Sequence, residues 1–275
     1  MEWGCILMAD YRVIDVEQLE NGLIMVADSI REKCDTNDPL EFPNGMADAV
    51  GGIQTQDTEF GEIYWVESFH GRSIYAYAFY EWKHDKFPFI DTSNGTNFQN
   101  TFAYSAITKL PNFNFSKAQM IYRMFNNAKK LKTVTFDFSK VTNNGHEVFR
   151  DCSALEILEA SNTTNITNFS LWCNGCVSLK SVKTLDFTKA TNVSDMFTGC
   201  TALEEVEIVT GTIKTSISFA DSPLLSSESI QSIIDGLATV TTAQTLTFHK
   251  NIEAKLSDEQ KAQITSKNWT LAFAS

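Results

Sequence analysis

The residues of this chain that are best suited to chemistry are two cysteines, Cys173 and Cys176, with two residues between them. Thiols at this spacing bind zinc or exchange disulfides. A tetrahedral zinc site needs two further ligands, and the sequence holds no second pair of cysteines or histidines at ligand spacing. Cys152 and Cys200 lie 24 residues on either side of Cys176, which indicates a repeated small, buried position. We therefore predict six free thiols and no metal site.

The other reactive groups form no catalytic motif. The four histidines match no zinc-binding or nucleophile-elbow pattern, and these are His70, His84, His146 and His249. We expect His146 to be a solvated turn residue. No glycine-rich phosphate-binding pattern is present, and nothing selects a pair of carboxylates for glycoside hydrolysis. The sequence thus predicts no catalytic residues and no cofactor, and the protein is expected not to be an enzyme. A glycan-active enzyme is the least favoured of the three hypotheses for the function of this protein; the two others, both non-enzymatic, follow from the repeats and the N-terminal segment.

The composition bounds the class of protein. The chain has 275 residues, of which 43% are apolar and 20% charged, as in ordinary globular proteins. No apolar run approaches the roughly 18–20 residues of a membrane span, and the acidic start shows no signal peptide, although Met8 is an alternative start to Met1. The net charge of −12 argues against binding to nucleic acid. Residues 1–60 hold 13 acidic and 3 basic residues, which predicts a separate acidic segment.

A repeat runs through the middle of the sequence. Its clearest copy, 196–208, has an aromatic residue, Phe197, then a small residue, Cys200, then Leu203 and an alternating run typical of a strand. The leading position recurs every 22 to 24 residues, at 79, 102, 125, 149, 173, 197 and 219. A constant period of this length predicts about seven coils that stack and share one core.

Two positions near each turn indicate how the coils fit together. The residue before the small position is of a type that tolerates a left-handed backbone, so we expect a turn at Asn127, Asp151, Gly175, Gly199 and Asp221. A large side chain at the small position would push adjacent coils apart, and it holds Ser105, Ala128, Cys152, Cys176, Cys200 and Ser222. In the second copy, Thr108 stands where a leucine is expected.

This pattern resembles the BspA-type leucine-rich repeats of bacterial surface proteins and some phage-borne proteins. The resemblance rests on 196–203 and its copies and covers about residues 73–225. It implies an α/β fold, a right-handed leucine-rich-repeat solenoid with one short strand per coil. It also implies adhesion or protein interaction, with no catalytic machinery shared across the family.

The two ends differ from the repeat. Beyond 225 the spacing predicts a helix over 226–237 with Ser226 or Ser227 as N-cap, a strand over 244–249, a capping box at 257–260 and a strand over 269–273. At the other end, helices are expected over 16–33 and 46–53. We therefore divide the chain into an acidic helical segment, 1–60, a repeat domain, 61–225, and a helix-containing C-terminal cap, 226–275.

The N-terminal runs 26–33 and 40–50 resemble a short helical segment of tail-associated proteins of phages and prophages of Gram-positive bacteria. That resemblance implies a virion or tail-appendage location, with homo-oligomers formed through residues 1–60. The alternative is a cell-surface or secreted adhesin.

Aromatic residues are dense between 60 and 90, and two roles remain open for them. Large apolar side chains would seal the open end of the stack, which is the favoured interpretation. The second is a candidate ligand surface made by Tyr75, Tyr77, Tyr80 and Trp82. The expected partner is a protein or a cell-surface glycan.

Overall fold

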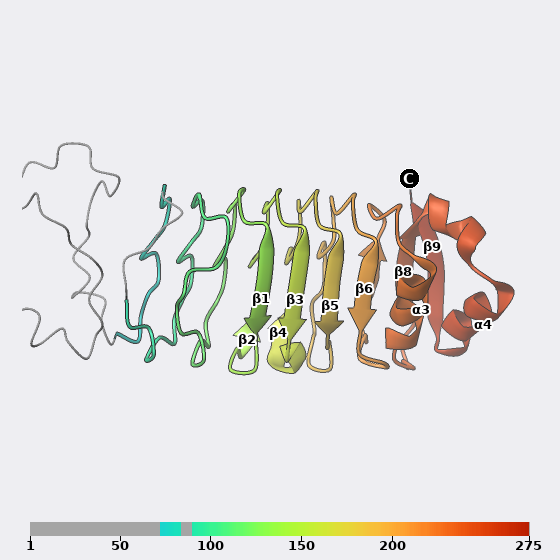
Figure 1. Cartoon of the computed structure of the whole chain (residues 1–275). Coiled ribbons are helices and arrows are strands. Elements are labelled where there is room, and N and C mark those ends of the chain that lie inside the picture. Colours follow the sequence, from blue (N-terminus) through green and yellow to red (C-terminus); the bar gives the residue numbers. More distant parts are fainter. Residues whose placement is uncertain (1–71, 84–89, 275) are drawn as a thin grey trace, which may run out of the picture. The chain divides into compact units, whose positions relative to one another are not determined.

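The computed structural model of the protein describes residues 72–83 and 90–274, which belong to one compact unit, Phe69–Ser275. Successive coils of this unit stack side by side, and its C-terminal end is helical (Figure 1). The helices expected over 16–33 and 46–53, and the phage-like runs, lie outside the described residues. Within the described ranges no helix is long and apolar enough to cross a membrane.

The elements of the repeat region are short strands. In chain order they are β1 (Thr133–Asp137), β2 (Asn143–Asn144), β3 (Ile157–Ser161), the 3-10 turn η3 (Thr163–Asn165), β4 (Ile166–Asn168), β5 (Ser181–Leu185), β6 (Glu205–Ile208) and β7 (Ile217–Phe219). The C-terminal part follows with α3 (Ser227–Gly236), β8 (Gln244–His249), the 3-10 helix η4 (Lys250–Lys255), α4 (Asp258–Ser266) and β9 (Trp269–Ala274).

Each coil makes two passes with the core between them. On the forward pass, β1, β3, β5 and β6 form one parallel sheet in that order. The register advances by one repeat, because Val134 pairs with Leu158 and Leu158 with Val182. These side chains are buried, and in β1 and β3 they alternate with exposed neighbours, as expected for strands with one face in a core. The short parallel strands predicted from the period are confirmed.

The return pass carries the leading aromatic residues. The rings of Phe79, Phe102, Phe125 and Phe149 stack in sequence with centroids 5.5 to 5.7 Å apart and planes within 8°. In the fifth coil the leading residue is a cysteine, and Trp172 supplies the aromatic ring, 5.4 Å from Phe149 and edge-on to it. The core is therefore continuous from coil to coil, since each ring is buried against the next.

Each of the first six described coils has two left-handed residues, four positions apart. The predicted turns at Asn127, Asp151, Gly175 and Gly199 are confirmed, with φ between 58° and 76°. Asp221 also lies in a turn, but its backbone is not left-handed. Its carboxylate instead accepts a hydrogen bond of 2.7 Å from the Gly199 N–H, which a backbone carbonyl receives at the equivalent place in the preceding coil. The earlier left-handed position was not predicted, and it holds Tyr77, Asn100, Arg123, Glu147, Leu171 and Asp195.

The second coil differs in register from the sequence alignment. Ile107, not Thr108, occupies the buried leucine position. The turn after Ser105 is one residue shorter than the turn after Ala128, so the chain reaches the core one residue earlier. The Lys132 N–H donates to the Thr108 carbonyl at 3.1 Å, which sets the two coils in this register.

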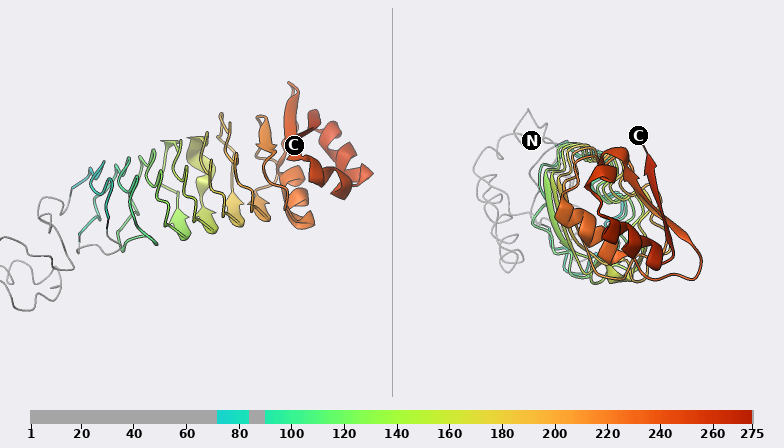
Figure 2. Two further views of the ribbon diagram at one scale, coloured as in Figure 1. Left: turned by 90° about the horizontal axis from the view of Figure 1, so that it is seen from above. Right: turned by 90° about the vertical axis from the view of Figure 1, so that its right-hand side faces the viewer.

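Towards the C-terminus helices replace the strands of the forward pass. Helix α3 lies beside β6, where Ser229 Oγ accepts from the Val206 N–H at 2.9 Å and Ser232 Oγ from the Ile208 N–H at 3.0 Å. These bonds satisfy N–H groups that an edge strand would leave exposed. The return pass becomes the parallel sheet β7-β8-β9, with Phe219 opposite Phe248, so stacked passes continue beyond residue 225 (Figure 2).

The local signals for this C-terminal part are confirmed. Ser226 is the N-cap of α3 and accepts from the Ser229 N–H. Ser257 and Gln260 form the reciprocal capping box of α4. The strands expected over 244–249 and 269–273 are β8 and β9.

Candidate functional site

Three exposed tyrosines lie together on the return pass of the first two described coils, with Tyr80 in contact with the other two. Tyr77, Tyr80 and Tyr104 are 56%, 41% and 51% exposed. The ring of Tyr80 lies 5.8 Å from that of Tyr77 and 5.4 Å from that of Tyr104. We call these three residues the tyrosine surface. Aromatic rings grouped at the surface, with polar hydroxyl groups, are suited to recognition.

The other two residues of the predicted ligand surface lie elsewhere. Tyr75 is only 1% exposed, its ring stacks on Phe98 at 5.2 Å, and its hydroxyl donates to the Asp91 carbonyl at 2.7 Å. Tyr75 is thus a core residue and its placement in a ligand surface is corrected. The backbone turns left-handed at Tyr77, which breaks the strand-like alternation expected from the sequence. Trp82 is half-buried, and its ring packs edge-on against the core residue Phe79 at 5.5 Å.

The backbone at Tyr104 costs conformational energy. Its φ is 61°, in the left-handed region, where a side chain other than that of Gly, Asn or Asp is disfavoured by about 1–2 kcal/mol. Later coils place Asn127, Asp151, Gly175 and Gly199 at this position. A bulky aromatic residue at a place that small turn residues fill in the four later coils indicates that its side chain contributes something other than turn formation.

The surface continues onto the third coil as a cation–aromatic pair. The guanidinium carbon of Arg123 lies 4.8 Å from the centre of the Tyr122 ring. Tyr122 in turn stacks on His146 of the fourth coil, with centroids 5.5 Å apart and planes within 10°. Tyrosine and arginine side chains therefore extend over successive coils on the same pass.

A buried carboxylate anchors this arrangement. Glu147 is 3% exposed and binds Arg123 Nε at 2.5 Å, Arg150 Nη1 at 3.1 Å and His146 Nε2 at 3.0 Å. Burial raises the pKa of Glu147, but the hydrogen bond and charge of Arg123, together with His146 and Arg150, outweigh it, so the pKa lies below its ordinary value. The bond to Glu147 also raises the pKa of Arg123. Glu147 thus holds the Arg123 side chain beside Tyr122.

His146 is not the solvated residue that the sequence predicts. Its Nδ1 lies 2.6 Å from Ser170 Oγ and 3.1 Å from the Ser170 carbonyl, while Nε2 faces Glu147. Serine, histidine and glutamate in a row have the order of a hydrolase triad. Ser170, however, is 6% exposed and donates its hydroxyl to Asn168 Oδ1 at 2.7 Å. Ser170 is thus no accessible nucleophile. The contacts of Ser170, His146 and Glu147 instead join the turns of two neighbouring coils.

The cysteines form a ladder inside the turns. Cys152, Cys173, Cys176 and Cys200 are free and buried. Three of the thiols donate to the carbonyl of the leading residue one coil earlier, at 3.0 Å from Cys152, 3.0 Å from Cys176 and 3.2 Å from Cys200. Burial raises the pKa values of Cys152, Cys173 and Cys200 well above their ordinary range, which disfavours the thiolate. In the described ranges no cluster of ligand-type side chains is arranged for a metal ion.

The comparison with protein families decides the architecture. The family model described as the BspA type leucine rich repeat region, in six copies, matches residues 72–204 and 118–254. The chain is a BspA-type leucine-rich-repeat protein. Such repeats suggest a protein-binding or adhesion module, and the family is typically non-enzymatic. No curated protein and no solved structure matches the chain.

For this BspA-type protein, sequence reasoning missed Tyr104, Arg123 and Glu147. The sequence did contain a signal for Tyr104. In its copy of the repeat an aromatic residue stands at the position where later copies have a turn-forming residue. Nothing in the repeat indicated Arg123 and Glu147. Arg123 and Glu147 meet because both have a left-handed backbone, at the same position of two neighbouring coils. No copy of the repeat has a glycine at this position, so the sequence does not mark it.

Proposed function

We propose that this protein is a non-enzymatic recognition module that binds a protein partner through the tyrosine surface. The observation that carries the proposal is the contact of Tyr80 with both Tyr77 and Tyr104, three rings that are each more than two-fifths exposed. Tyrosine and arginine are enriched among the residues that dominate binding energy. Because the rings are carried by a stack with a continuous core, little conformational entropy is lost when they bind.

We also propose that the module is carried on a phage or prophage tail appendage. The support is the resemblance of 26–33 and 40–50 to tail-associated proteins and the acidic character of residues 1–60. In this proposal residues 1–60 mediate homo-oligomers. A bacterial cell-surface or secreted adhesin is the competing location.

The hand of the stack belongs to the same proposal. We propose one right-handed solenoid, as the family resemblance implies. Support comes from the pairing β1-β3-β5-β6, in which every parallel neighbour is reached by a crossover through the return pass. Such crossovers are right-handed in about 98% of cases.

The binding proposal is tested with the fluorescently labelled full chain on intact bacterial cells, measured by flow cytometry. The cells are used untreated, after protease treatment or after periodate oxidation of glycans. We expect saturable binding to untreated cells, no binding after protease treatment of the cells, and unchanged binding after periodate oxidation. The variant Y77A/Y80A/Y104A should bind at least about tenfold more weakly, since each lost aromatic anchor costs about 1 kcal/mol or more.

A matched variant controls for the loss of exposed apolar area. I157A/V177A/V209A removes three side chains that are 42% to 47% exposed elsewhere on the stack, and it should bind like the parent. Equal binding by the tyrosine variant and the parent would refute the assignment of the surface. Binding abolished by periodate and retained after protease would replace the protein partner by a glycan.

The location is tested separately. An antibody raised against the full chain should detect it in purified phage-like particles. Light scattering of the full chain should give a trimer, as the resemblance to tail-associated proteins implies. Detection in the cell envelope alone, with a monomer in solution, would favour the adhesin.

A further inference from the structure

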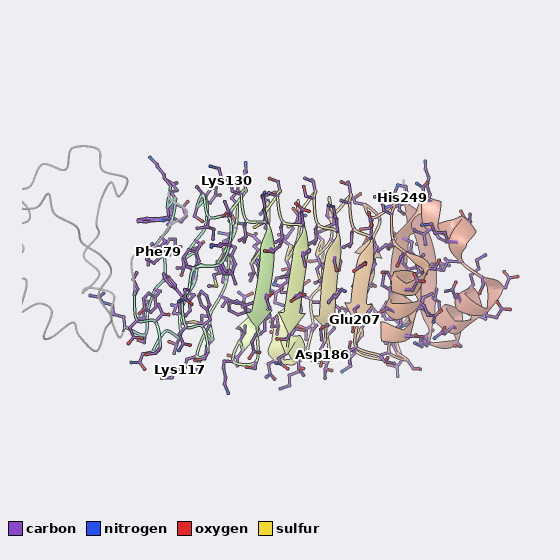
Figure 3. All side chains as sticks on the ribbon, viewed as in Figure 1. Phe79, Lys117, Lys130, Asp186, Glu207 and His249 are labelled. Carbon is purple, nitrogen blue, oxygen red and sulfur yellow. The ribbon has the colours of Figure 1, made fainter. Side chains whose placement is uncertain are left out.

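Four exposed lysines gather on one edge of the stack, in the turns of two adjacent coils. Lys129, Lys130 and Lys132 belong to one turn, and Lys109 to the turn before it along the stack. The Lys132 N–H donates to the carbonyl of Thr108, the neighbour of Lys109, so the two turns are directly joined. Lys130 points away from the stack at this edge, opposite the edge that carries Lys117 (Figure 3). We call these four residues the lysine edge.

The lysine edge stands out against the charge of the whole chain. The turns 105–109 and 128–132 hold the four lysines and no acidic residue, a net charge of +4, in a protein whose total is −12. The remaining residues therefore carry −16. Such a local reversal of sign attracts anions and is unfavourable for the protein alone, because like charges repel.

Two lysines on later coils form ion pairs with carboxylates, whereas those of the lysine edge do not. Lys180 binds Glu156 at 3.1 Å, and Lys183 binds Glu205 at 3.4 Å. Glu156 follows Lys132 in the same row of the stack but forms its ion pair with Lys180. Among the described residues, no carboxylate forms an ion pair with any of the four ammonium groups.

The chemistry of the edge indicates the class of ligand. Lysine presents a compact point charge that binds sulfate or phosphate groups, and these two turns contain no arginine, the residue preferred for bidentate recognition of carboxylates and phosphates. The turns 105–109 and 128–132 expose no large apolar side chain that would anchor a protein. A nucleic acid would need a longer basic track, and acidic residues, Glu81 and Glu156, stand on the coils at either side. We infer that the lysine edge binds a polysaccharide that carries sulfate or phosphate esters.

This inference goes beyond the proposed function and does not depend on it, since none of the four lysines belongs to the tyrosine surface. It is tested with fluorescein-labelled dextran sulfate and unsubstituted dextran of the same length, which differ only in charge. Fluorescence anisotropy of the full chain should report binding of dextran sulfate alone. Four neutralised anions predict a slope of log K against log salt of about −3.

The variant K109Q/K129Q/K130Q/K132Q should bind dextran sulfate at least about tenfold more weakly and with a flatter salt slope. Its melting temperature should not fall, since the four side chains are exposed and repel one another. The matched control, K117Q/K140Q/K189Q/K214Q, removes four exposed lysines from other turns, and so the same total charge. We expect it to bind within about threefold of the parent.

Three results would overturn the inference. They are no binding of dextran sulfate at about 0.05 M salt, an equal loss in both quadruple variants, and tighter binding of a duplex oligonucleotide than of dextran sulfate. The tyrosine variant Y77A/Y80A/Y104A should retain dextran sulfate binding, so that the outcomes for the two surfaces are separable.

Discussion

The thiol of Cys176 donates a hydrogen bond to the carbonyl oxygen of Phe149, 3.0 Å away on the preceding coil. Cys152 makes the same bond to Phe125 at 3.0 Å. Each of these two cysteines therefore both lets the coils approach closely and donates to a buried carbonyl of the preceding coil. Cysteine serves this position as a small buried side chain with a weak donor, and the C-x-x-C spacing results from Cys173 at the leading position.

The volume available at Cys176 is the first quantity to test. Replacing Cys176 by Trp should lower the free energy of unfolding by more than about 2–3 kcal/mol, because the side chain is fully buried between coils. Val177 is the next residue and is 47% exposed, so Val177→Trp should cost less than about 0.5 kcal/mol. Urea unfolding followed by circular dichroism measures both. Equal midpoints for the two variants would contradict the coil register.

The thiols of the ladder should be unreactive in the folded protein. Burial raises the pKa values of Cys152, Cys173 and Cys200, and the thiolate is the species that alkylates. We expect iodoacetamide at neutral pH to leave the peptides with these cysteines unmodified, and to label them fully in urea. Peptide mapping by mass spectrometry reads each site. Rapid labelling of Cys173 in native buffer would contradict the structure.

The carboxylate of Glu147 should make stability depend on pH. Its folded pKa is depressed, so its contribution is fully present above the unfolded value of about 4.3 and is lost as the pH falls through the folded pKa. Glu147→Gln should lower the free energy of unfolding at pH 7 by about 1–3 kcal/mol, because Arg123 and Arg150 lose their charged partner.

The parent and Glu147→Gln should therefore converge in stability as the pH falls below about 4.3 and through the folded pKa of Glu147. Denaturant unfolding at several pH values measures the difference. Glu159→Gln is the control, since Glu159 is exposed on the forward sheet and only accepts a bond from Thr135. A constant difference between the parent and Glu147→Gln across this range would mean that the charge of Glu147 is not what stabilises the turns.

Tyr104 should show opposed effects on stability and binding. Tyr104→Gly relieves a left-handed backbone that costs about 1–2 kcal/mol, and it loses a ring contact with Tyr80 worth about 0.5–1.5 kcal/mol. We expect the free energy of unfolding to change by less than about 1 kcal/mol, while cell binding falls at least about tenfold.

Gly175→Ala provides the reverse comparison. A Cβ there would lie 2.4 Å from Asp151 Oδ1 at a φ of 76°, so stability should fall with no loss of binding. A large loss of stability in Tyr104→Gly would show that the tyrosine is retained for packing.

Particular residues show how far the sequence could be followed. The capping box of Ser257 and Gln260 was predictable because it depends only on residues within one helical turn. The place of Ile107 was not, since the length of the turn before it is decided by pairing with the coil that follows. The separation of Tyr75 from Tyr77 was missed for a related reason. A left-handed residue interrupts the alternation that the sequence suggests, and no glycine marks it.

By itself the sequence determined the repeat family, the spacing of the coils, the buried cysteine position and the local caps, because each depends on residues that are close in the chain or repeat at a constant period. Only the tertiary structure decided which side chains meet between coils. The contacts of Tyr80 with Tyr104 and of Arg123 with Glu147 each join residues 24 positions apart. Their geometry depends on the backbone of two turns at once, and a periodic pattern does not encode it.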